Sequence, residues 1–171
     1  MIIQCTKKLA DEMKLKVSKP DLLNVNQIYC WHAHLFKIGR KKCVLVMNNV
    51  TRYHFVLYGL VKKDFVMFEE IVKMNIVSNF LADGINPDHV DWYINQLGDI
   101  QFYATSDRSI ISQMNDSILS LEYIIYYEAE RGNTIDIFEI NRDLNCTPMM
   151  KIPKYPNKMM IDALNEQYSK N

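Results

Sequence analysis

The sequence predicts a single α+β domain over residues 1–171, with a small, mainly antiparallel sheet of about five strands packed against long helices on one face. Residues 28–60 form three apolar runs separated by two turn signals, which is typical of a β-meander. Longer segments repeat apolar residues at steps of three and four and stop at glycine, as amphipathic helices do. A chain of 171 residues, 49% of them apolar, is long enough for one hydrophobic core.

The first elements follow from local patterns. Met1–Cys5 reads as a short buried strand, and Thr6 can cap a helix that ends near Met13. Residues 14–27 read as a loop because they gather Ser, Pro and Asn. The meander then comprises strands at 29–38, 43–48 and 52–58, with turns at 39–42 and 49–51.

Simple register in both hairpins sorts the meander into two faces. One face is almost entirely apolar and should form the core: Trp31, Ala33, Leu35, Val44, Val46, Tyr53, Phe55 and Leu57. The other face is apolar at one end and polar at the other, and it includes Cys30, His32, His34 and His54. We expect this second face to be half covered or to line a pocket, with His54 nearer Phe36 than His34.

The remaining elements are mostly helical. Predicted helices span 64–82, 87–97, 108–131 and 157–168, and a fifth strand spans 100–104. Asn86, the cluster Thr105–Asp107 and Asn157 serve as N-caps, with Pro87 in a first helical turn. Residues 133–144 fit either period, and we favour a helix. The stretch 145–171 can form a peripheral C-terminal extension.

Composition narrows the function classes. The 20 basic side chains balance the 20 acidic ones, so no global field draws the protein to nucleic acid or to an anionic membrane. Apolar runs are far shorter than the ~20 residues of a transmembrane helix, and no signal-peptide pattern follows Met1. We therefore expect a cytoplasmic protein without a cofactor. The 4 cysteines are widely spaced, which favours reduced, mostly buried thiols.

Three motifs resemble those of a bacterial family known only as a domain of unknown function: MIIxCTKKLA at 1–10, WHAxLF at 31–36 and DRSxxxxMND at 107–116. The resemblance spans about residues 1–150. It implies a shared fold and supplies no activity. The chain departs from the family pattern at His34, where asparagine is usual, and at Ser112 and Gln113. The matched polar and aromatic residues are Thr6, Lys7, Lys8, Trp31, His32, Asp107, Arg108, Ser109 and Asn115.

A metal site or an enzyme would use the histidine face. His32 and His34 lie two apart on one strand, with Cys30 beside them, and imidazole suits zinc or iron. No Asp or Glu on these strands supplies a third ligand. A nucleophile, Cys5 or Ser109, with His32 as base is a further alternative, but no nucleophile elbow or orienting residue accompanies either one.

A binding role fits the sequence better than an enzyme does. Basic residues of a local patch can bind nucleic acid, with Trp31, Tyr53 and Tyr58 as stacking surfaces. The many Met and Tyr residues suit a protein partner. We therefore predict a non-enzymatic regulatory module that acts on a protein or protein–nucleic-acid partner, with a mobile-element-encoded inhibitor as one version. The expected binding residues are Lys7, Lys8, Trp31, His32, Arg40, Lys41, Lys42, Arg52, Asp107, Arg108 and Ser109.

Overall fold

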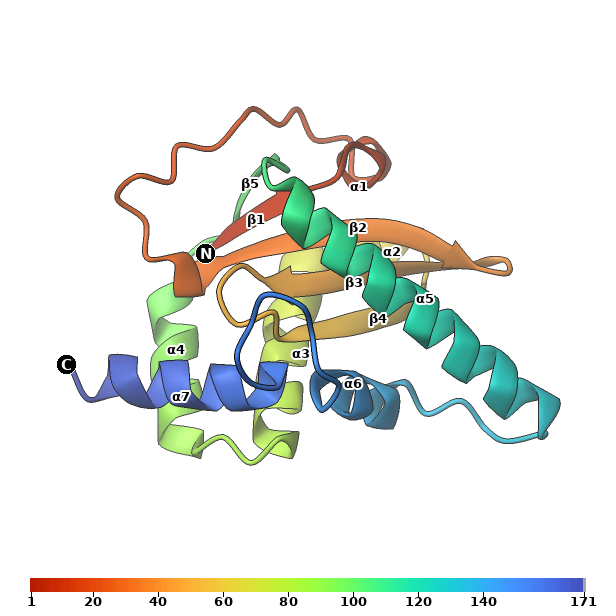
Figure 1. Ribbon diagram of the computed structural model, residues 1–171. Helices are drawn as coiled ribbons and strands as arrows, with labels where there is room; N and C mark the ends of the chain where they lie inside the picture. The colour runs from red at the N-terminus through yellow and green to blue at the C-terminus, as the bar shows by residue number, and fades with distance from the viewer. Residues whose placement is uncertain (171) are drawn as a thin grey trace.

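The computed structural model describes residues 1–170 and combines one sheet with helices (Figure 1). The strands are β1 (Ile2–Cys5), β2 (Cys30–Ile38), β3 (Lys41–Asn48), β4 (His54–Leu60) and β5 (Gln101–Ala104). The helices are α1 (Lys7–Glu12), α2 (Lys62–Val66), α3 (Phe68–Ala82), α4 (Pro87–Leu97), α5 (Arg108–Glu130), α6 (Ile137–Asn145) and α7 (Pro156–Tyr168), with a 3₁₀ turn, η1, at Gln27–Tyr29. Within residues 1–170, no helix combines the length and hydropathy needed to cross a bilayer.

The predicted α+β fold is confirmed, and its sheet is mixed. The strand order is β4-β3-β2-β1-β5. The meander pairs are antiparallel, as predicted, but β1 runs parallel to both of its neighbours, β2 and β5. Parallel strands require long crossover connections, which the chain provides through the segment between residues 5 and 30 and the helices between 60 and 101.

The predicted core face of the meander is confirmed. Val46 pairs with Ala33 on one side and with Phe55 on the other, and all eight predicted side chains belong to one buried cluster. The prediction that His54 lies nearer Phe36 than His34 was wrong. Met47 pairs with both His32 and His54, so the two histidines lie in one row across three strands, separated by a methionine.

Helices cover both faces of the sheet, which corrects the expectation of helices on one face. The first cluster contains residues of α2, α3, α4 and α7. On the opposite face, α5 and α6 pack on Phe36, Leu45, Met47 and Val56. The face that was expected to be half open is therefore largely buried. Figure 1 shows α5 lying diagonally across this face.

Two helix boundaries differ from the prediction. The segment 64–82 is divided between α2 and α3 at Met67, where φ is −101° and ψ is 25°. The last helix begins at Pro156, with Tyr155 as N-cap in place of Asn157. Within the stretch 145–170, Met160 and Leu164 of α7 are fully buried in the first cluster. The helix predicted within residues 133–144 is confirmed by α6.

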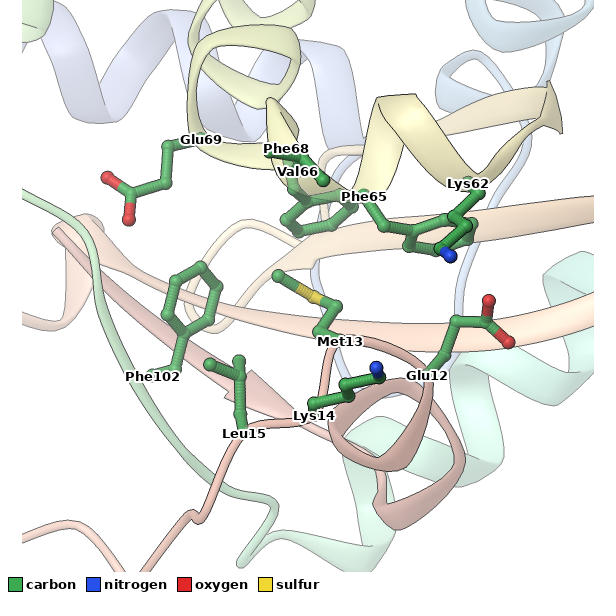
Figure 2. A pocket seen from close by; sticks show the side chains of 10 residues that line it. All are labelled: Glu12, Met13, Lys14, Leu15, Lys62, Phe65, Val66, Phe68, Glu69 and Phe102. Carbon is green, nitrogen blue, oxygen red and sulfur yellow. The ribbon is translucent and has the colours of Figure 1, made fainter.

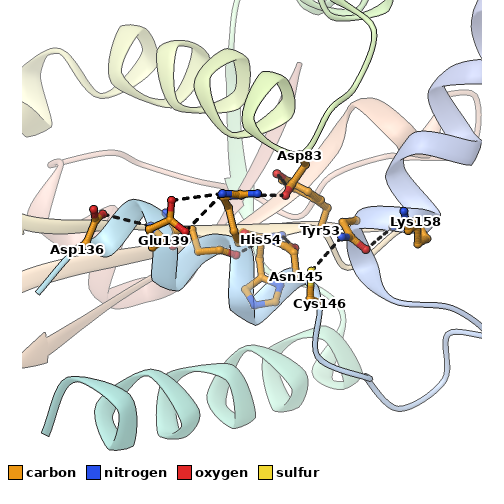
Figure 3. A network of polar contacts seen from close by, with 11 residues as sticks. Tyr53, His54, Asp83, Asp136, Glu139, Asn145, Cys146 and Lys158 are labelled. Carbon is orange, nitrogen blue, oxygen red and sulfur yellow. Dashed lines mark hydrogen bonds and ion pairs between the residues drawn. The ribbon is translucent and has the colours of Figure 1, made fainter. Parts of the chain in front are cut away.

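The free edge of β4 is occupied by side chains of α6 (Figure 3). Asn145 accepts a hydrogen bond from His54 N at 2.9 Å and donates to His54 O at 2.6 Å. One helical turn earlier, Asn141 accepts from Val56 N at 2.9 Å. All three contacts are buried, so these amides replace a neighbouring strand and satisfy backbone groups that an edge strand leaves unpaired.

Candidate functional site

The carboxyl ends of the parallel strands β1 and β5 meet at one edge of the sheet. Each strand runs directly into a helix, β1 through Thr6 into α1 and β5 through residues 105–107 into α5. Thr105 N donates to Cys5 O at 3.2 Å, and Thr6 N donates to Ala33 O at 3.0 Å. Ligands of open sheets commonly bind at the carboxyl ends of parallel strands, so this edge is the first candidate site.

Motif segments that are far apart in the sequence come together here. The segment 6–8 begins α1, the segment 107–109 begins α5, and His34 of β2 places its Nδ1 3.2 Å from Thr6 Oγ1. Lys7, Lys8, Asp107, Arg108 and Ser109 were all predicted binding residues, and the structure gathers them around this edge. We name the surface the carboxyl-edge site and define it by Thr6, Lys7, Lys8, Thr105, Ser106, Asp107 and Arg108.

Two cavities open at the carboxyl-edge site. One, of about 370 Å³, lies between α1 and the end of β5, and its lining includes Lys7 and Thr105. The other, of about 360 Å³, lies at the start of α5 and is lined by Thr105, Ser106, Asp107, Arg108 and Ile111. Both volumes fall within the range of small-ligand or side-chain pockets.

The site is cationic, and the start of α5 is already capped. Within residues 1–170, Lys8 and Arg108 form no hydrogen bond or ion pair through their side chains, and Lys7 pairs only with Asp11 at 2.7 Å, in an exposed contact worth little. Asp107 Oδ1 accepts from Ser109 N at 2.7 Å and from Ile110 N at 3.3 Å, as the predicted N-cap requires. An anion bound here would therefore contact side-chain cations in place of the helix N–H groups.

A partly buried chain of hydrogen-bonded side chains connects the carboxyl-edge site to His32 of β2. Gln4 Nε2 donates to Ser106 Oγ at 2.9 Å, and Asn49 Nδ2 donates to Gln4 Oε1 at 3.1 Å. His32 Nδ1 lies 2.7 Å from Asn49 Oδ1, which can only accept, so Nδ1 carries the proton and Nε2 is left as a buried acceptor without a partner in the described residues. Burial lowers the pKa of His32. The chain ties β2 to the loop before α5.

Trp31 and His32 offer no surface to a partner, although both were predicted binding residues. Both side chains are fully buried. Trp31 Nε1 donates to Tyr93 OH at 3.0 Å inside the first core cluster. Tyr53, a predicted stacking surface, is also fully buried and donates its hydroxyl to Asp83 (Figure 3). These residues stabilise the fold around the site.

The histidine face has the geometry of a packed interior. Its His32 and His34 use their Nδ1 atoms in contacts with Asn49 and Thr6. Within residues 1–170, no three His, Cys, Asp or Glu side chains are grouped so that they could hold a metal ion. Burial raises the pKa of Cys30 to about 11 and that of Cys5 to about 12, so both thiols are protonated at neutral pH and are poor nucleophiles or ligands.

The predicted basic turn lies at the tip of the β2–β3 hairpin. Arg40 is exposed, whereas Lys41 Nζ lies 4.6 Å from the centre of the Tyr58 ring. Lys42 pairs with Glu12 of α1 at 2.6 Å. Arg52 belongs to another loop, where its Nε donates to Gln113 Oε1 of α5 at 2.5 Å. The turn thus contacts other parts of the molecule through two of its three cations.

The structure also has an aromatic pocket that was not predicted from the sequence. It has a volume of about 370 Å³ and lies between α1 and α2–α3 (Figure 2). Phe65, Phe68 and Phe102 form its wall, with ring centres 6.5 Å apart for the first two and 6.4 Å apart for the last two. Charged side chains of both signs stand at its lining, including Lys62 and Glu69. The pocket can accept an apolar side chain, but its phenylalanines are indistinguishable from core residues in the sequence.

The histidine face makes stability depend on pH. Burial lowers the pKa of His54 to about 4, from 6.5 for a free side chain, and burial also lowers the pKa of His32 and His34. Between these pH values the unfolded chain binds more protons than the folded one, so the stabilisation is complete above pH 6.5 and is lost as pH falls towards 4. At about 1.4 kcal/mol per pKa unit, we expect His54 alone to contribute a loss of about 3 kcal/mol.

Urea unfolding at pH values from 7.5 to 4.5 measures this loss. In the variant His54→Asn, the amide can replace the Nδ1 donor that contacts Arg52 O at 2.8 Å, but it does not titrate. The difference between the two proteins removes the contribution of all other groups. Identical pH dependence in both would show that His54 is not the titrating group.

The fold and the site define an α+β protein with a cationic site at the carboxyl edge of its parallel strands. The chain belongs to the family described as "Domain of unknown function (DUF6933)", which matches residues 2–159. The predicted membership of a family of unknown function is thereby confirmed, and the match extends beyond residue 150. Neither the curated proteins nor the solved structures contain a match to the chain.

Proposed function

We propose that the protein is a non-enzymatic binding module that recognises an acidic or phosphorylated segment of a partner protein at the carboxyl-edge site. One observation carries the proposal. Lys7 and Arg108 begin the helices that follow β1 and β5, about 100 residues apart, and each lines one of two cavities at the same edge of the sheet. Lys8, which is also exposed, follows Lys7 on α1. Convergence of exposed cations beside a cavity favours an anionic ligand.

The same charges favour a protein over a nucleic acid. Lys7 is paired with Asp11, and Asp107 lies beside Arg108, so the positive potential is confined to a small area. A nucleic acid would need cations that follow its backbone over several phosphates, and the net charge of zero gives no long-range attraction. A single carboxylate or phosphate group needs only two or three cations.

The enzyme or metalloprotein alternative rests on His32 and His34 and has less support. Their Nδ1 atoms already contact Asn49 and Thr6, and the His32 side chain is fully buried. No hydrogen bond within residues 1–170 joins His32 to Cys5 or Ser109, the two nucleophiles considered, and Ser109 Oγ accepts from Lys151 Nζ at 2.8 Å. In the carboxyl-edge site, by contrast, Lys7, Lys8 and Arg108 are exposed.

The double variant Lys7→Ala/Lys8→Ala tests the proposal against Lys62→Ala/Lys63→Ala, which removes the same charge from α2. Tagged proteins are used for affinity capture from host lysate, with untreated, nuclease-treated and phosphatase-treated samples quantified by mass spectrometry. We expect a protein that the wild type and the α2 variant retain and that the α1 variant loses by at least tenfold, because both exposed cations contribute to the contact.

The treatments identify the ligand chemistry. Loss of the partner after phosphatase treatment assigns a phosphorylated segment, and retention assigns an acidic one. Loss after nuclease treatment would assign the site to nucleic acid instead. Equal recovery by the two double variants would remove the carboxyl-edge site from the binding function.

A further inference from the structure

The outer face of α5 carries large side chains that are mostly exposed. Leu119, Tyr123 and Tyr126 are 64%, 70% and 62% exposed. The inner face of the same helix supplies the second core cluster through residues such as Met114 and Leu121. A helix that packs on a core with one face is normally polar on the other, and contiguous exposed apolar side chains mark an interaction surface.

This outer face is arranged symmetrically about Leu119, which is the midpoint of α5. Its residues recur at steps of three and four, which places them on one side of the helix, and every one of them is exposed: Arg108, Ser112, Asn115, Leu119, Tyr123, Tyr126 and Glu130. At equal distances from Leu119, Asn115 mirrors Tyr123, Ser112 mirrors Tyr126, and Arg108 mirrors Glu130. Each small polar residue is thus matched by a tyrosine, and the cation by an anion.

A twofold axis through Leu119 would bring the residues at equal distances from Leu119 into contact across two antiparallel α5 helices. In an isologous interface, residue i of one subunit contacts residue j of the other, and residue j of the first contacts residue i of the second, so each contact occurs twice. With two antiparallel α5 helices and the axis at Leu119, that residue meets the partner's Leu119. Tyr123 and Tyr126 lie over the partner's Asn115 and the partner's Ser112, where the small side chains leave space for the rings.

The charges at the two ends of α5 agree with the same arrangement. Arg108 has no ion pair within residues 1–170, and Glu130 accepts one hydrogen bond, from Tyr126 OH at 2.5 Å. The final turns of α5 also carry Glu122 and Glu128, which leaves this half of the helix acidic. A parallel pair of helices would bring like charges together, whereas an antiparallel pair brings Arg108 to the partner's Glu130 at both ends.

We propose that the protein forms a homodimer through the outer faces of two antiparallel α5 helices, with the twofold axis at Leu119. This inference goes beyond the proposed function, with which it shares one residue, Arg108. Lys7 and Lys8 lie on α1 and take no part in the α5 contact, so the variants that test the two proposals do not overlap. Arg108 lies where the two surfaces adjoin.

Sedimentation equilibrium of the wild type and of charge variants tests the dimer. Leu119→Glu should give a monomer, because two carboxylates would meet at the axis. Arg108→Glu or Glu130→Arg alone should raise the dimer dissociation constant at least tenfold, since each creates two like-charge contacts. An equimolar mixture of these two variants should form a heterodimer, because every facing pair is then of opposite sign. Glu70→Arg on α3 is the matched control, and circular dichroism checks folding.

The outcomes separate the alternatives. A wild-type monomer at 100 μM or above would overturn the proposal, as would a dimer that Leu119→Glu leaves intact. Weakening by both single charge variants without recovery in their mixture would exclude the antiparallel arrangement. A monomeric wild type that captures another protein through Leu119 would assign the face to that protein instead.

Discussion

Replacing Trp31 with alanine should lower the free energy of unfolding by about 3–5 kcal/mol, as expected for removing a large aromatic side chain from a packed core. Trp31 is fully buried, lies 6.0 Å from the Phe55 ring between centroids, and donates its indole N–H to Tyr93. The cavity would open in the middle of the sheet, where β1 and β3 flank β2 and cannot easily collapse. Urea unfolding at pH 7.5 measures the loss.

Two variants separate packing from hydrogen bonding at Trp31. Tyr93→Phe keeps the ring but removes the hydroxyl that accepts from Trp31 and donates to Ile28 O at 2.9 Å, so about 1–3 kcal/mol should be lost. Trp92→Ala removes a partly exposed tryptophan that touches Tyr168, and its cost should be smaller. A nearly neutral Trp31→Ala would instead make Trp31 a surface residue available to a partner.

Replacing Asn145 with alanine should cost about 2–6 kcal/mol, because it leaves the buried N–H and C=O of His54 without partners and each such group costs about 1–3 kcal/mol. Urea unfolding with a constant m-value measures this loss as a shift of the midpoint. Asn133→Ala is the matched control, since Asn133 is exposed and contacts Glu128 on the surface. A similar small effect at both positions would mean that water replaces the Asn145 amide.

The sequence predicted local structure well where pattern and stereochemistry agree. Alternation of apolar and polar residues predicted the two faces of the meander. Asn86 and Asp107 predicted helix starts, and Gly84 and Gly98, both at positive φ, predicted helix ends. Strand direction was not predictable for β1, because periodicity has no polarity. The break at Met67 has no Gly or Pro signal. The polar residues on the histidine face concealed its burial, since the Nδ1 atoms of His32, His34 and His54 find partners inside the molecule, in Asn49, Thr6 and the Arg52 carbonyl.

The candidate site was predictable only in part. Lys7, Lys8 and Asp107–Ser109 were singled out through family motifs, but their proximity depends on the pairing of β1 with β5, which no local pattern shows. Trp31 and His32 carry the same motif signal and prove to be structural. Motif residues therefore include those that build a site as well as those that can contact a ligand. Only burial distinguishes the two.

The position of β1 also bears on how the molecule folds. The meander closes through short turns, whereas β1 pairs Ile2 with Gln101, across roughly 100 residues of chain. Closing so long a loop costs more entropy, so we expect the meander to form early and the β1–β5 pair to form late. The carboxyl-edge site requires that last pair. A partner that binds there would therefore select chains whose sheet is complete, and its binding would slow the first step of their unfolding.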